Sequence, residues 1–172
     1  MYPRRGDTTV TRSGPPRGPA GAYAGVKVSP VPPPPSPENP LQGGCLCGAV
    51  RYEITAPFLS AGYCHCTHCQ RRTGTGSSAN GRVPQEGFRL LAGSERIRAF
   101  QPPTGVPKLF CSECGSALFS GDPFGDPEVA VRLGTLDGDP GIRPSRRQYT
   151  ASAAPWEPIP DDGLERHPGA RP

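Results

Sequence analysis

The residues best suited to chemistry in this 172-residue chain are seven cysteines, which fall into three clusters along the sequence. The clusters are a C-x-C pair, a C-H-C-x-x-C group and a C-x-x-C pair: Cys45 and Cys47; Cys64, Cys66 and Cys69; Cys111 and Cys114. Thiolates at such short spacings are typical zinc ligands. An odd number of thiols does not suit a disulfide framework, and no apolar run typical of a secretory signal follows Arg4 and Arg5. We therefore expect metal binding in a reducing compartment, the cytoplasm.

Ligand number suggests how the seven thiols divide. A structural zinc site is closed by four ligands, whereas a working site keeps three and leaves one position exchangeable. Cys64, Cys66 and Cys69 are close enough in sequence to hold one ion alone. The other four cysteines would then form the closed site, which would tie the start of the domain to a hairpin about 65 residues later. The sequence thus predicts two Zn²⁺ ions per chain.

Two histidines lie within the central cluster, and either imidazole could close the three-cysteine site as a fourth ligand. Because alternate side chains of an extended segment point to opposite sides, His65 is the poorer candidate. His68 precedes Cys69 directly, so we predict that it carries a proton or supports the site. Whether this site is open or closed is left undecided by the sequence.

Three thiolates more than balance the charge of a zinc ion, so such an ion is a weak Lewis acid toward carbonyl groups. It is better suited to binding a further thiol as thiolate, the nucleophilic form of sulfur. We therefore predict thiol chemistry, with Cys64, Cys66, Cys69 and His68 as the catalytic group. The alternative is that both clusters only stabilise the fold.

The elements that must position these residues are short strands. Alternation of apolar and polar residues, with Gly, Pro and Asp between segments, predicts strands over 49–55, 88–91, 96–100, 107–110, 117–119 and 128–133. Only 67–73 is suited to a helical turn. We predict a mostly β domain over 41–160, followed by a frayed tail over 161–172. Hydrophobic residues make up only 34% of the chain, so the core is thin and zinc would supply part of the folding free energy.

Residues 1–40 differ from the rest in composition. They hold 11 of the 25 prolines and a net charge of +3 out of the chain's +4. Such a Pro/Gly/Arg-rich segment is predicted to be a disordered arm. The remainder is nearly neutral, which argues against nucleic-acid binding, and no stretch approaches the roughly 20 apolar residues of a membrane helix.

Three segments together resemble the glutathione-dependent formaldehyde-activating enzyme family, which includes centromere protein V. They are GGCLCGAVRY at 43–52, CHCTHCQRRTG at 64–74 and FCSECGSAL at 110–118. The resemblance implies a β-rich, Mss4-like fold with two zinc sites, divided among the cysteines as above. It also implies a carbon–sulfur lyase that joins formaldehyde to glutathione, or an analogous thiol to an aldehyde.

The resemblance also directs attention to arginines near the motifs. Arg51, Arg71 and Arg72 would pair with the carboxylates of a peptide thiol. Arg147 stands where family members often carry a histidine. The alternatives to an enzyme are an inert zinc-stabilised binding module of the same fold and a thiol or zinc sensor.

Overall fold

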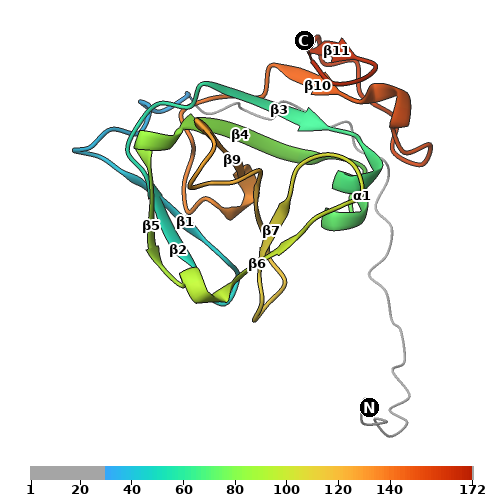
Figure 1. The fold of residues 1–172 in the computed structure, drawn as a ribbon. Coiled ribbons are helices and arrows are strands. Elements are labelled where there is room, and N and C mark those ends of the chain that lie inside the picture. The colour runs from blue at the N-terminus through green and yellow to red at the C-terminus, as the bar shows by residue number, and fades with distance from the viewer. Residues whose placement is uncertain (1–29, 172) are drawn as a thin grey trace, which may run out of the picture. The chain divides into compact units, whose positions relative to one another are not determined.

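The computed structural model describes residues 30–171. This part of the chain contains eleven β-strands and one α-helix, so the prediction of a mostly β fold is confirmed (Figure 1). Four 3₁₀ helices complete the elements: Gln85–Gly87, Ser94–Arg96, Leu133–Thr135 and Thr150–Ser152. Most of the arm predicted over 1–40 lies outside the described residues. Among the described helices, none has the length and apolar character needed to cross a membrane.

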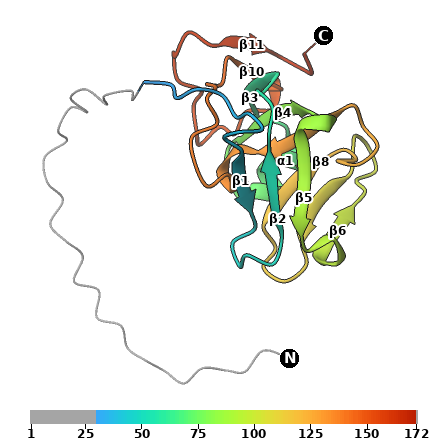
Figure 2. The same ribbon diagram turned by 90° about the vertical axis from the view of Figure 1, so that its left-hand side faces the viewer.

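The smaller sheet has three antiparallel strands in the order β1-β2-β5: β1 (Leu41–Gly44), β2 (Arg51–Ile54) and β5 (Phe88–Ala92). Figure 2 shows these strands side by side. In β2 the apolar residues Tyr52 and Ile54 are fully buried, as the sequence predicted. Glu53 is buried as well, and it forms an ion pair with Arg89 of β5.

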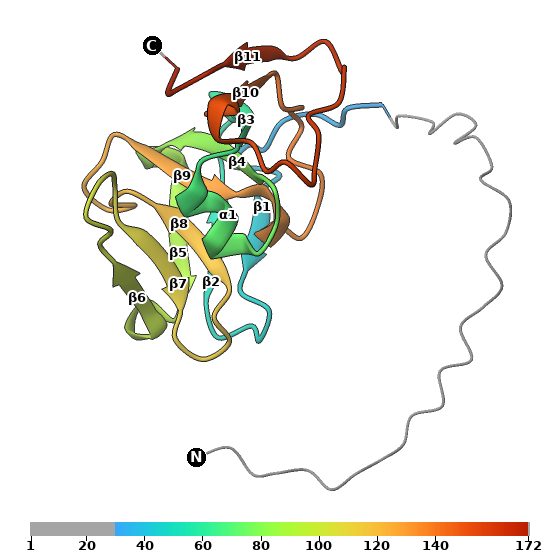
Figure 3. The ribbon, with the colours of Figure 1, turned by 90° about the vertical axis from the view of Figure 1, so that its right-hand side faces the viewer.

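The larger sheet has eight strands in the order β11-β10-β3-β4-β9-β8-β7-β6. Their bounds are β3 (Ser60–Cys64), β4 (Ser78–Pro84), β6 (Ile97–Phe100), β7 (Lys108–Cys111), β8 (Ala117–Ser120), β9 (Glu128–Arg132), β10 (Arg146–Gln148) and β11 (Glu165–His167). Strand β10 runs parallel to both β3 and β11, and the other pairs are antiparallel. The helix α1 (Thr67–Thr73) follows β3 and packs near β4 (Figure 3).

The core lies between the two sheets. The rings of Tyr52 and Phe88 from the small sheet meet Phe119 of β8, with ring centroids 5.2–5.6 Å apart. Val129 and Val131 of β9 are fully buried in the same cluster. Because these valines point into the core, their neighbours Ala130 and Arg132 lie on the opposite face of the large sheet.

The sequence analysis did not predict five strands, namely β1, β3, β4, β10 and β11. The prediction of a frayed tail over 161–172 also differs from the structure, because β11 within this segment pairs with β10 along its whole length. Strands β3 and β4 are rich in Gly, Ser and Ala, residues of low strand propensity. Packing explains one of these small residues, since a Cβ atom at Gly81 would lie 2.6 Å from the Phe58 ring.

Candidate functional site

Four cysteine sulfurs meet between the two sheets. The Sγ atoms of Cys45, Cys47, Cys111 and Cys114 all lie within 4.8 Å of one another. The Cys45–Cys47 and Cys47–Cys111 sulfur distances are 3.5 and 3.9 Å. Tetrahedral sulfur ligands about 2.3 Å from a zinc ion lie about 3.8 Å apart, so this donor set fits such an ion.

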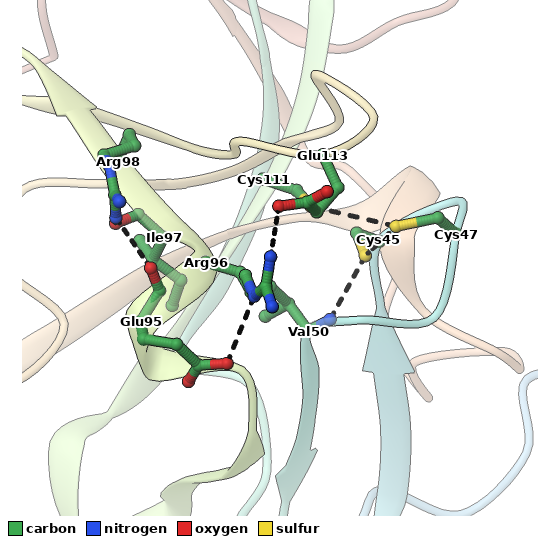
Figure 4. A network of polar contacts seen from close by, with 9 residues as sticks. All are labelled: Cys45, Cys47, Val50, Glu95, Arg96, Ile97, Arg98, Cys111 and Glu113. Atoms are coloured by element: carbon green, nitrogen blue, oxygen red, sulfur yellow. Dashed lines mark hydrogen bonds and ion pairs between the residues drawn. The ribbon is translucent and has the colours of Figure 1, made fainter.

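Backbone geometry at two turns brings these sulfurs together. Cys45 follows β1, and its sulfur accepts a hydrogen bond of 3.2 Å from the Val50 backbone amide (Figure 4). Cys111 ends β7, and the left-handed conformation of Gly115 (φ 75°) lets its amide donate back to the Cys111 carbonyl. The four-thiol cluster therefore joins a turn of the small sheet to a turn of the large one.

The other three sulfurs form a separate cluster at the end of β3. Those of Cys64, Cys66 and Cys69 also lie within 4.8 Å of one another. Cys66 caps α1, because its sulfur accepts a hydrogen bond of 3.4 Å from the Cys69 amide. Hydrogen bonds from Cys64 and Cys66, with a smaller contribution from Arg132, lower the pKa of the Cys69 thiol.

Neither histidine joins the three-thiol cluster within the described residues. His65 is buried, and its Nε2 lies 3.3 Å from the Arg147 guanidinium. Burial, followed by the charge of Arg147, lowers the pKa of His65. The cluster therefore presents three sulfurs, and no imidazole of this part of the chain stands at a fourth position.

A cavity of about 390 Å³ opens directly beside the three-thiol cluster. Its floor is the face of the large sheet that points away from the core, as the alternation along each strand shows. On β3, for example, Ser60, Gly62 and Cys64 line the cavity. Gln148 of β10 and the following Tyr149 line it as well, together with His68 of α1.

The cavity lining contains five basic residues and no acidic ones: Arg82, Lys108, Arg132, Arg146 and Arg171.

Arg132 is the most deeply placed of the arginines in this lining, because only 6% of its surface is exposed. Its guanidinium donates to Ser78 and Ser120, while its Nε is buried without a hydrogen-bond partner. No carboxylate of the described residues pairs with Arg132. Burial lowers the pKa of Lys108. Anions are thus favoured in this cavity.

The arginines selected from the sequence lie elsewhere, and the cavity lining includes none of them. Arg51 forms an ion pair with Asp137 beside the small sheet. Arg72 has a structural role, since its guanidinium donates hydrogen bonds to the Leu109 carbonyl and the Ser120 hydroxyl. Arg71 and Arg72 border a second, more apolar hollow of about 490 Å³, which His68, Lys108, Phe100 and Phe110 also line.

Arg147 likewise does not line the cavity. It is buried, forms an ion pair of 2.5 Å with Asp162, and its guanidinium lies 4.5 Å from the centre of the Tyr63 ring. Its neighbours Arg146 and Gln148 face the cavity instead. Arg147 therefore anchors the C-terminal segment to β10 and β3.

Sequence reasoning missed Lys108, Arg132 and Arg146, which line the cavity, whereas the arginines that it chose do not. One signal was available for Arg132, because it ends an alternating strand whose valines mark the opposite face as core. Lys108 and Arg146 carry no such signal. Their positions depend on pairing between strands that are distant in sequence.

The fold and the site together define a class of protein: a mostly β domain with two thiol clusters, one between its sheets and one beside a basic cavity. A model of the family described as "Glutathione-dependent formaldehyde-activating enzyme" matches residues 40–152. This chain belongs to that family.

Two relatives carry the family's name. A Halomonas elongata protein bearing the family's name is 29% identical over 112 residues, 62% of this chain and 71% of that protein. A Sordaria macrospora protein of the same name is 26% identical over 89 residues, 48% of this chain and 38% of its own length. A crystal structure of a Rhodobacter sphaeroides protein matches with a TM-score of 0.46 and 26% identity, over 60% of this chain and 91% of that one.

Proposed function

We propose that this protein accelerates the joining of formaldehyde to a small thiol, glutathione or an analogue, as a carbon–sulfur lyase with two zinc ions per chain. The observation that carries the proposal is the opening of the three-thiol cluster onto a cavity lined by five basic residues and no acidic ones. The family name and the names of the relatives support glutathione and formaldehyde as reactants.

The two clusters are proposed to hold zinc for different reasons. Cys45, Cys47, Cys111 and Cys114 complete a four-thiolate set, which is typical of structural sites. Zinc held by Cys64, Cys66 and Cys69 supplies a position for a further sulfur and favours its thiolate form. The remaining steps depend on this chain's own side chains.

The cations of the cavity bind and orient the substrate. Arg132 and Lys108 lie beside the three thiols and stabilise the negative charge of a substrate thiolate. The sulfur lone pair forms the new C–S bond to the formaldehyde carbon, and the π electrons of C=O move to oxygen. That oxygen then takes a proton, and the proton lost by the thiol returns to solvent, giving an S-hydroxymethyl adduct.

His68 is the proposed proton donor, because it lines the cavity near the cluster and carries a titratable imidazole. It is half-buried, so it can exchange protons with solvent between turnovers. Lys108 lines the same cavity and serves as the second candidate, and burial lowers the pKa of its ammonium group.

The test must account for spontaneous adduct formation. NMR exchange spectroscopy would measure the rate of S-hydroxymethylglutathione formation with the zinc-loaded protein and with the same concentration of free zinc. We expect a faster exchange with the wild-type protein and the uncatalysed rate with Cys66→Ala. Equal rates for wild type and free zinc would refute the activity and favour an inert zinc-stabilised module.

A further inference from the structure

The cavity extends well beyond the three-thiol cluster along the sheet. Ser60, Gly62 and Cys64 line its floor along one strand, with the cluster at the Cys64 end. At about 3.3 Å per residue, Ser60 lies roughly 13 Å from Cys64. A substrate sulfur at the cluster would therefore leave the Ser60 end of the cavity free for the rest of the molecule.

Three arginines gather at this far end. Arg82 is the β4 partner of Ser60, and the Arg146 guanidinium donates to the Ser60 hydroxyl over 3.1 Å. Arg171 lines the same cavity from the C-terminal segment. After burial, the charges of Arg171 and Arg82 are the main causes that lower the pKa of Arg146, so the three cations lie close enough to repel one another.

Little in the protein compensates this charge. Arg82 pairs with Glu128 over 3.1 Å, and Glu165 also acts on Arg146 through its charge. Among the described residues, however, no carboxylate lies within 4 Å of the charged nitrogens of Arg146 or Arg171. Crowded cations that face a cavity without acidic lining are stabilised when an anion binds there.

We propose that Arg82, Arg146 and Arg171 form a second subsite, which binds a carboxylate or phosphate at the end of the thiol substrate remote from its sulfur. This inference rests on the proposed function and narrows its substrate class. The preferred thiol is elongated and carries an anionic group about 10 Å or more from sulfur. A compact thiol would reach only the cations beside the cluster.

The C-terminal segment supplies one of the three arginines of this subsite, Arg171. The family match ends at residue 152, whereas Arg171 lies beyond it. Strand β11 pairs with β10, which carries Arg146, and the Arg147–Asp162 ion pair also holds the segment. In Figure 1, β11 and the C-terminus lie beside β10. The subsite is thus completed by residues outside the part that defines the family.

The test compares pantetheine with pantetheine 4′-phosphate, two thiols that differ only in the phosphate group at the end remote from sulfur. Calorimetry on the zinc-loaded, full-length protein measures both dissociation constants without formaldehyde, so the result does not depend on catalysis. We expect the phosphorylated thiol to bind about tenfold more tightly. Arg146→Gln should abolish this preference, and Arg171→Gln should reduce it about threefold. Glutathione and its diethyl ester, compared in the same way, show whether a carboxylate serves as well as phosphate.

Arg166→Gln is the matched control, because Arg166 lies on β11 but does not line the cavity. It should leave the preference unchanged. Arg171 is exposed near the C-terminus, so its variant reports on binding even where Arg146→Gln fails to fold. Two results would overturn the proposal. The first is equal affinity for the two pantetheines together with equal affinity for glutathione and its ester. The second is a preference for the phosphorylated thiol that Arg171→Gln leaves unchanged. Selective binding without catalysis would instead refute the proposed function and leave the subsite standing.

Discussion

Arg132 shows how one residue can matter to the site while being inconspicuous in the sequence. Its guanidinium is buried beside three thiols and has no carboxylate partner among the described residues. Three thiolates and a divalent ion carry a net charge of about −1, which a buried arginine would balance. The strand pattern over 128–133 indicates the face on which Arg132 lies, but not that this face borders a cavity.

At the same scale, His68 provides a direct test of proton transfer. His68→Gln removes the proposed proton donor while keeping a polar side chain of similar length. We expect the catalysed rate of adduct formation to fall by about 10²-fold, with metal content unchanged, as measured by exchange NMR and metal analysis.

His167→Gln is the control for this change, since His167 lies on β11 outside the cavity lining. It should keep the wild-type rate. A His68→Gln variant of full activity would transfer the role to Lys108 or to solvent.

At the scale of elements, β3 and β4 explain why the sequence underpredicted the sheet. Their small residues satisfy packing demands that no local pattern reveals. Gly62 lies beneath Arg146, where a Cβ atom would be 2.9 Å from the arginine Cγ. The cysteine motifs, by contrast, are local signals, so the grouping of the thiols was predictable while the strands around them were not.

Gly81 makes this packing measurable. Gly81→Ala would place a methyl group against the buried Phe58 ring, and we expect the free energy of unfolding to fall by about 1–3 kcal/mol. Gly134→Ala is a suitable control, because no atom lies within 4 Å of the added Cβ position. Denaturant unfolding of both variants would show the difference, and equal stabilities would contradict the packing argument.

The attachment of β11 to β10 depends on a partly buried ion pair. Arg147 lowers the pKa of the Asp162 carboxyl. Since the folded-state pKa is depressed, the stabilisation is present above the ordinary carboxyl pKa and is lost as pH falls through the lowered value. Values of about pH 6 and about pH 8 both lie above that ordinary value, so the ion pair stabilises the protein equally at the two. Asp162→Asn should therefore increase hydrogen exchange over 160–171 by a similar factor at about pH 6 and pH 8.

Asp161→Asn provides the comparison, because Asp161 is exposed and its nearest basic nitrogen, on Arg166, is 3.8 Å away. Its exchange should match the wild type. If Asp162→Asn also matched the wild type, the hydrogen bonds of β11 alone would account for the attachment.

At the scale of the whole domain, the four-thiol cluster connects the two sheets. Cys111→Ala should cost at least about 5 kcal/mol, enough to unfold a domain of ordinary stability. Cys66→Ala should leave the domain folded with one metal equivalent fewer. Metal analysis and thermal unfolding, followed by circular dichroism, would measure both effects.

Equal unfolding of the two cysteine variants would mean that both clusters are structural. One metal equivalent in the wild-type protein would contradict the division into four and three. The sequence predicted this division because cysteine spacing is local. It could not predict the basic cavity, because six separate strands and the C-terminal segment build its walls.

The outer edge of the large sheet is formed by β6, and Figure 4 shows Arg98 on this strand. Its guanidinium donates to the carbonyls of Glu95 and Ile97, over 2.7 and 3.1 Å. Because Arg96 and Arg98 face β7 in the hydrogen-bonded register, these two carbonyls point outward, where a strand of another molecule would pair. Arg98 thus occupies acceptors that would otherwise favour aggregation through edge-to-edge pairing.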